Sequence, residues 1–179
     1  LESVGRVGGQ RHRPEHLVVA RRVGDAVGLR VVEEHAVAEG HETLGIDLPG
    51  RADDQNYISA DLTDFGATVD ALHGAEAVIH LAAIPDSRMV STARTFANNM
   101  SSLWNVYEAC RVLNIKRVVF ASTIQTVITS MRRNPTEYRY FPLDEAHPVD
   151  PQSDYALSKA LGEQVGTMFA RHYGLTVVS

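Results

Sequence analysis

Tyr155 and Lys159 stand four residues apart in the run Tyr-Ala-Leu-Ser-Lys. On a helix this spacing places both side chains on one face, one turn apart. A phenol has a pKa of about 10 and is a poor base at neutral pH, but a nearby ammonium group favours the phenolate and lowers that pKa. Tyr155 would then exchange a proton with a substrate hydroxyl. The motif is short enough to occur by chance, and its context strengthens it, because two hydroxyls, Ser122 and Thr123, end an apolar run upstream.

Carboxylates follow two of the expected strands. Asp47 stands where a dinucleotide fold accepts hydrogen bonds from the adenosine ribose. Its negative charge would repel the extra phosphate of NADP, so we expect NAD in preference to NADP. Asp61, with Leu62 beside it, is placed to reach an adenine. The alternatives are that Asp47 is a turn residue before Pro49, and that the run from Asp61 is a helix N-cap sequence.

A further apolar run, Val78–Ala83, ends in small residues. Small side chains at the carboxyl end of a strand let a flat cofactor approach the backbone closely, so Leu81, Ala82 and Ala83 are candidates for cofactor binding. His80, in the same run, is expected to be a packed rather than a catalytic histidine.

These residues need elements that hold them at one edge of a sheet. From residue 28 onward, short β-branched runs alternate with helix-length segments, which predicts an α/β fold with a doubly wound parallel sheet covered by helices on both faces. Apolar residues at steps of three and four predict a long helix over Phe96–Cys110 and another over Tyr155–His172, ended by Gly174. Segment Ile128–Pro142 is expected to be a loop. The expected strands are Thr43–Asp47, Tyr57–Ala60, Ala77–Leu81, Arg117–Ser122 and Leu175–Val178.

The composition excludes several classes of protein. The 179 residues are 44% hydrophobic and 22% charged, the balance of one globular domain. A net charge of -5 argues against nucleic acid and membrane surfaces as partners. The single cysteine, Cys110, cannot form an internal disulfide, which favours a reducing cytoplasm. No apolar run approaches the roughly 20 residues that span a bilayer, so we expect a cytoplasmic protein with a small-molecule partner and no metal.

Taken in order, these motifs resemble the extended short-chain dehydrogenase/reductase family, the branch of NAD-dependent epimerases and dehydratases. The resemblance implies a Rossmann-like domain in which Tyr155 is the acid/base and Thr123 bonds the substrate oxygen, with Ser122 as its substitute. It also implies that Lys159 holds the nicotinamide ribose and that Asn99 supports the site from the long helix. Over roughly residues 28–179, the matching positions are Asp47, Asp61-Leu62, His80-Leu81-Ala82-Ala83, Asn99, Phe120-Ala121-Ser122-Thr123 and Tyr155-x-x-x-Lys159.

The start of the chain departs from the family, which opens with an apolar strand and a Gly-x-x-Gly-x-x-Gly turn that seats the pyrophosphate on a helix N-terminus. Leu17–Ala20 is a short candidate for that strand. Gly28 matches the third glycine, and Gly24 is out of register. A damaged or misread start explains this best, with residues 1–16 as a disordered or non-native leader. Weak cofactor binding is the expected result.

Residues 17–179 are expected to form the NAD-binding domain, truncated before the C-terminal substrate domain that family members carry. The implied activity is hydride transfer between NAD and a carbinol carbon of a sugar or nucleotide-sugar, by epimerisation, dehydration or oxidation, with this fragment itself inactive. One alternative is a simple reductase or sugar-acid dehydrogenase with the same residues. Another is a non-catalytic regulator that binds the dinucleotide. A homodimer is compatible with each.

Overall fold

A computed structural model of the chain describes residues 16–20, 32, 34–48, 57–85, 90–127 and 139–179. The described residues contain one parallel sheet in the order β3-β2-β1-β4-β5-β6. The strand order reverses between β1 and β4, as in a doubly wound sheet. This confirms the predicted α/β class. The strands are β1 (His16–Ala20), β2 (Glu42–Asp47), β3 (Tyr57–Ser59), β4 (Ala75–His80), β5 (Arg117–Phe120) and β6 (Thr176–Val178).

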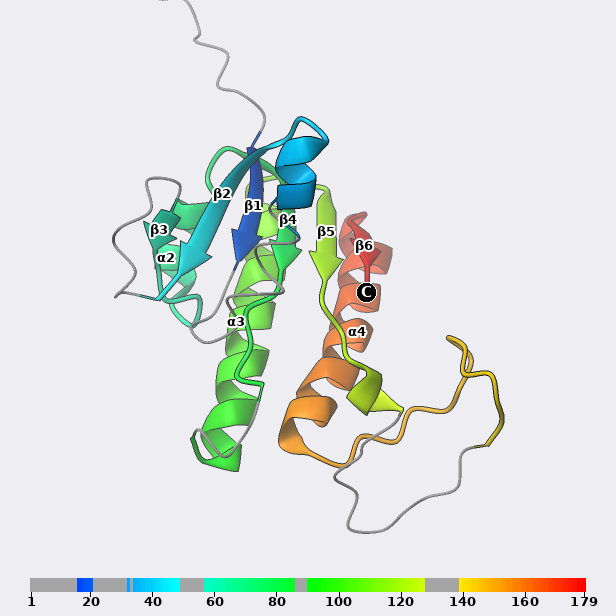
Figure 1. The fold of residues 1–179 in the computed structure, drawn as a ribbon. Coiled ribbons are helices and arrows are strands. Elements are labelled where there is room, and N and C mark those ends of the chain that lie inside the picture. The colour runs from blue at the N-terminus through cyan, green and yellow to red at the C-terminus, as the bar shows by residue number, and fades with distance from the viewer. Residues whose placement is uncertain (1–15, 21–31, 33, 49–56, 86–89, 128–138) are drawn as a thin grey trace, which may run out of the picture.

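Helices cover the sheet on both faces (Figure 1). Three labelled helices lie behind the sheet in that view, and the helical residues 34–38 lie in front of it. The three are α2 (Phe65–Leu72), α3 (Thr92–Val112) and α4 (Asp154–Tyr173), and a short 3-10 helix, η1 (Ile124–Thr126), follows β5. None of the described helices is both long and apolar enough to cross a lipid bilayer.

The candidate first strand is present at the centre of the sheet. β1 pairs with β2 on one side and with β4 on the other, and its Val19 side chain is fully buried. It begins at His16, one residue before the predicted start, so His16 belongs to the sheet and not to the predicted leader. Residues 1–15, and the candidate glycines Gly24 and Gly28, lie outside the described residues.

Helix ends follow local sequence signals. Ser91 and Ser153 cap α3 and α4, each accepting a hydrogen bond from the backbone three residues on. Gly174 ends α4 with a φ of 68°, in the left-handed region that favours glycine. The predicted helix stop is therefore confirmed.

All five of the other predicted strands are present, but their ends differ from the prediction. The strand predicted over Arg117–Ser122 stops at Phe120, because after one more backbone bond to β4, from the Ala121 amide to the His80 carbonyl, the chain enters η1 at its cap, Thr123. The predicted ends Ala60 and Leu81 also lie just outside their strands, as does the predicted start Leu175. Ala60, Leu81 and Ser122 follow the ends of their strands at the carboxyl edge, where regular pairing gives way to loops.

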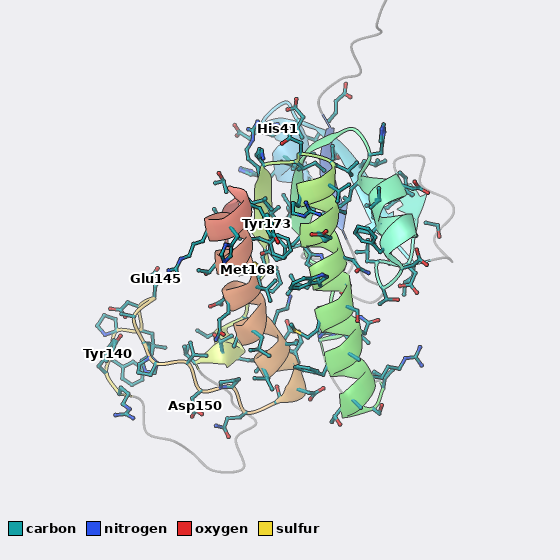
Figure 2. The ribbon with its side chains drawn as sticks, turned by 180° about the vertical axis from the view of Figure 1, so that it is seen from behind. His41, Tyr140, Glu145, Asp150, Met168 and Tyr173 are labelled. Carbon is teal, nitrogen blue, oxygen red and sulfur yellow. The ribbon has the colours of Figure 1, made fainter. Side chains whose placement is uncertain are left out.

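The core lies between the sheet and the α3–α4 pair. Tyr107 of α3 stacks on Phe169 of α4 with ring centroids 5.2 Å apart, and both side chains are fully buried. Seen from behind (Figure 2), α3 and α4 lie side by side, with Tyr173 toward α3, where Arg111 lies 5.3 Å from its ring centroid. This packing holds the two helices that carry the candidate site residues in one relative position.

Candidate active site

Parallel strands bring their carboxyl ends to one edge of the sheet, and α3 and α4 both begin beyond that edge (Figure 1). The first turns of these helices therefore lie next to the loops that follow β4 and β5. Tyr155 is the second residue of α4, and Asn99 lies in the first half of α3. The sequence motifs that were separate in the chain thus reach one edge of the sheet.

Lys159 is held against the end of β5. Its ammonium donates to the Ala121 carbonyl at 2.6 Å and lies 4.6 Å from the centroid of the Phe120 ring. The same nitrogen lies 5.8 Å from the Tyr155 ring centroid. Burial lowers the pKa of Lys159 to about 8, because desolvation disfavours the charged amine. The lysine therefore remains mostly protonated at neutral pH and presents its charge to Tyr155.

His80 is a core residue beside this lysine. Its ring stacks on Phe120 with centroids 6.0 Å apart, and the side chain is 1% exposed. Burial, and then the charge of Lys159, lower the pKa of His80 to about 3. The imidazole is therefore neutral at physiological pH, which agrees with the expectation of a packed histidine.

Asn99 joins the loop after β4 to α4. Its Oδ1 accepts from the Ile84 amide at 2.6 Å, and its Nδ2 donates to the Ile84 carbonyl at 3.0 Å. The same Nδ2 donates to Ser158 Oγ at 3.2 Å, and that hydroxyl donates to the Tyr155 carbonyl at 2.7 Å. Asn99 therefore supports the helix that carries Tyr155 through Ser158, from a buried position.

The two hydroxyls after β5 have different partners. Ser122 donates its hydroxyl proton to Glu163 on α4. Thr123 caps η1, where its Oγ1 accepts from the Gln125 amide at 3.3 Å. A hydroxyl that accepts in this way still has its own proton to donate. Glu163 was missed by the sequence reasoning, although it follows Lys159 by four residues, the spacing that joins Lys159 to Tyr155.

A hollow of about 130 Å³ opens at the carboxyl ends of β2, β3 and β4. Asp61 lies in its wall and accepts from the Thr63 amide at 2.9 Å, whereas Asp64 caps α2. The helix N-cap interpretation therefore holds for Asp64 and leaves Asp61 at the hollow. Leu62, Ala82 and Ala83 also line it, and Leu81 does not. The other lining residues are Leu48, Ala60, Thr63, Ile84, Val90, Arg94, Asn98 and Ser102.

Asp47 ends β2 with a buried carboxylate, 3% exposed. Its Oδ1 accepts from the Leu48 amide at 2.7 Å, and its Oδ2 has no hydrogen-bond partner among the described residues. A buried carboxylate oxygen without a donor is costly, and a ribose hydroxyl would supply one. The residues here therefore fit an adenosine ribose. The described residues contain no cluster of three or more His, Cys, Asp or Glu side chains that would hold a metal ion.

Comparison with known proteins gives a family match over most of the chain. The model of the NAD dependent epimerase/dehydratase family matches residues 27–179. The uronate dehydrogenase of Pseudomonas putida is 32% identical over 136 residues, which are 73% of this chain and 46% of that enzyme. The chain spans about half the length of the curated relatives it matches.

Solved structures share the fold at similar coverage. A short-chain dehydrogenase/reductase superfamily protein from Agrobacterium tumefaciens with bound NAD is 26% identical with a TM-score of 0.76, over 90% of this chain and 47% of that one. The UDP-glucose 4-epimerase of Thermus thermophilus in complex with NAD is 25% identical with a TM-score of 0.70, over 90% of this chain and 53% of that one.

Proposed function

Because the chain belongs to the NAD-dependent epimerase/dehydratase family, we propose that it forms the cofactor-binding and proton-transferring part of an enzyme that oxidises a hydroxyl of a sugar-type substrate. The observation that carries this proposal is the placement of the Lys159 ammonium 5.8 Å from the centroid of the Tyr155 ring. That charge favours the phenolate, which is the form of tyrosine that can accept a proton.

Different residues at the carboxyl edge would bind different parts of the cofactor. Asp47 would accept from the adenosine ribose, and the hollow beside Asp61 would receive the adenine. Lys159 would hold the nicotinamide ribose, as the family resemblance implies. The chemistry that bound NAD⁺ would supply is acceptance of a hydride from the carbinol carbon.

The proton of the same hydroxyl goes to Tyr155. As the carbon–hydrogen bond breaks, the oxygen–hydrogen bond breaks with it and a carbonyl forms, and the phenolate takes the proton. Thr123 would donate its free hydroxyl proton to the substrate oxygen and orient it. Ser122 is less suited to that role, because its own proton goes to Glu163.

Two substrate classes receive support from the relatives. The Pseudomonas putida relative is a uronate dehydrogenase, which favours net oxidation of a sugar or sugar acid. The Thermus thermophilus structure is a UDP-glucose 4-epimerase, which favours the second candidate, epimerisation of a nucleotide-sugar. We favour net oxidation, because the uronate dehydrogenase matches 136 residues at 32% identity, whereas a putative UDP-glucose 4-epimerase at 34% identity matches only 102 residues.

The test uses what we call the extended enzyme. It consists of residues 16–179 with a family glycine turn at positions 21–28, joined in one version to the C-terminal half of the Pseudomonas putida uronate dehydrogenase and in a second version to that of the Thermus thermophilus UDP-glucose 4-epimerase. The later tests use the version that turns over its substrate. Net NADH formation from a uronate or an aldose supports the dehydrogenase. Interconversion of UDP-glucose and UDP-galactose without net NADH supports the epimerase. Binding of NAD without turnover of either class would contradict the proposal and favour a regulator.

We also propose a cellular compartment and an assembly. We place the protein in a reducing cytoplasm, since its one cysteine, Cys110, is buried as a free thiol. The assembly that we propose is a homodimer. Sedimentation of the extended enzyme at several concentrations tests it, and a single monomeric species throughout would contradict it.

A further inference from the structure

Among the described interactions of α4, Glu163 is the one charged side chain, apart from Lys159, that hydrogen-bonds a residue at the end of β5. It accepts the hydroxyl proton of Ser122, the residue immediately before Thr123. On α4 it lies four residues after Lys159, which itself lies four residues after Tyr155. The three side chains therefore follow one stripe of the helix. Tyr155 and Lys159 have roles in the proposed chemistry, and Glu163 has not been assigned one.

The end of β5 needs support from outside the sheet. Regular pairing ends at Phe120, and the next backbone bond to the sheet is the one from the Ala121 amide to the His80 carbonyl. Side chains of α4 hold the residues at this end of β5. Lys159 donates to the Ala121 carbonyl, and Ser122 donates to Glu163.

Close approach of α4 makes these bonds possible. A Cβ built on Gly162 would lie 2.5 Å from the Phe120 ring, a distance that real Cβ atoms do not reach. The glycine therefore lets the helix backbone lie directly against the strand end. Phe120, Ala121 and Ser122 are thus each held by α4, in sequence.

From this arrangement we propose that Glu163 is a positioning residue that acts through Ser122. By holding Ser122, it sets where the next residue, Thr123, stands relative to Tyr155 on the same helix. The inference rests on the proposed function, because it assigns Glu163 a part in orienting the substrate oxygen. Glu163 itself need not touch substrate or cofactor.

Four variants of the extended enzyme separate this role from others. Glu163→Ala and Ser122→Ala each remove one partner, and we expect kcat to fall about 10- to 100-fold, as for other small misplacements of reacting groups. The KM for NAD should change less than about twofold, since neither residue lines the hollow beside Asp61. Glu163→Gln keeps a carbonyl acceptor and should restore kcat to within about threefold. Gln164→Ala, at the exposed neighbour, is the matched control and should match the wild type.

The double variant tests whether the two residues act as one unit. Ser122→Ala combined with Glu163→Ala should be no slower than the slower single variant, because the same bond is lost in each. If the loss of kcat in the double variant equalled the product of the two single losses, the proposal would be overturned. A loss in Ser122→Ala with none in Glu163→Ala would also overturn it, since Ser122 would then act on the substrate by itself.

A second measurement keeps this test apart from the proposed function. In the 179-residue chain, NMR should show the backbone amide signals of Thr123 and Gln125 shifted by Glu163→Ala and Ser122→Ala. Glu163→Gln and Gln164→Ala should leave them close to their wild-type values. Unmoved signals would overturn the inference even if the extended enzyme is active. Moved signals with an inactive extended enzyme would support the positioning by Glu163 and contradict the proposed function alone.

Discussion

Asn99 on α3 and Ser158 on α4 are joined by a hydrogen bond of 3.2 Å between the amide Nδ2 and the hydroxyl Oγ. The same Asn99 side chain accepts a hydrogen bond from the Ile84 amide and donates one to the Ile84 carbonyl. Ser158 in turn donates its hydroxyl proton to the Tyr155 carbonyl. The loop beside the hollow at Asp61 and the first turn of α4 are therefore coupled through one buried amide. Movement of one would disturb the other.

Replacing Asn99 with alanine should lower the free energy of unfolding by about 2–4 kcal/mol. The change leaves the buried amide and carbonyl of Ile84 without partners, and each unsatisfied group costs about 1–3 kcal/mol. Urea unfolding of the 179-residue chain measures the effect. Asn98→Ala, at the neighbouring and less buried amide, is the control and should cost under about 1 kcal/mol. Equal effects of the two would show that the Ile84 bonds contribute little.

Tyr155→Phe should abolish most turnover of the extended enzyme. The ring keeps its packing, but the phenolate oxygen that accepts the substrate proton is lost, and general acid–base groups contribute about 10²–10⁴-fold. The loss should therefore fall on kcat, with NAD affinity within about threefold of the wild type. Steady-state kinetics and NAD titration give both values. Near wild-type turnover would mean that another residue is the acid/base.

Asp47→Ala should weaken NAD binding to the extended enzyme by about 10- to 100-fold. The buried Oδ2 is the acceptor proposed for the adenosine ribose, and hydrogen bonds to charged groups contribute about 1.5–3 kcal/mol. The preference for NAD over NADP should narrow as the negative charge is removed. Calorimetric titration with both dinucleotides decides this, and Asp70→Ala on α2 controls for the loss of an exposed charge. Tighter binding of NADP by the wild type would show that Asp47 does not face the ribose.

Acid should destabilise the chain through His80. Its pKa is lowered to about 3 in the folded state by burial and by the Lys159 charge, whereas an unfolded histidine has a pKa of about 6.5. Between these values only the unfolded chain takes up the proton, so the free energy of unfolding falls as the pH drops, by about 1.4 kcal/mol per pH unit.

His80→Leu should remove that contribution. Urea unfolding at about pH 7.5, 5.5 and 4.5 should show a smaller loss of stability on acidification in the variant than in the wild type. Above about pH 7 the two should have similar pH slopes, because neither state then takes up a proton at this position. An unchanged slope in acid would mean that His80 is protonated in the folded chain.

Alanine should lower the free energy of unfolding at one glycine and leave it unchanged or raise it at another. Gly162→Ala places a Cβ against the Phe120 ring and should cost about 1–3 kcal/mol by overpacking. At Gly66 in α2 a Cβ meets only the Asp64 carboxylate, at 3.3 Å, so alanine should be neutral or stabilise the chain by up to about 1 kcal/mol. Thermal unfolding of both variants measures the difference. A tolerated alanine at residue 162 would show that α4 does not lie tightly on β5.

The sequence alone was sufficient for the features that depend on near neighbours in the chain. The spacing of Tyr155 and Lys159 placed both on one helix face, and Gly174 marked the end of that helix. Alternating runs of apolar residues predicted the parallel sheet. The reason is that helix periodicity, caps and strand propensity are set by residues within a few positions of one another.

Only the tertiary structure decided which side chains meet. Ser122 was expected to stand in for Thr123, and it bonds Glu163, which lies 41 residues away. Asn99 reaches Ser158 across 59 residues. Such bonds form only where the packing of α3, α4 and the sheet brings separate elements within about 3 Å. Because no local pattern records that packing, the partners of Ser122 and Asn99 could not be assigned until the elements were placed together.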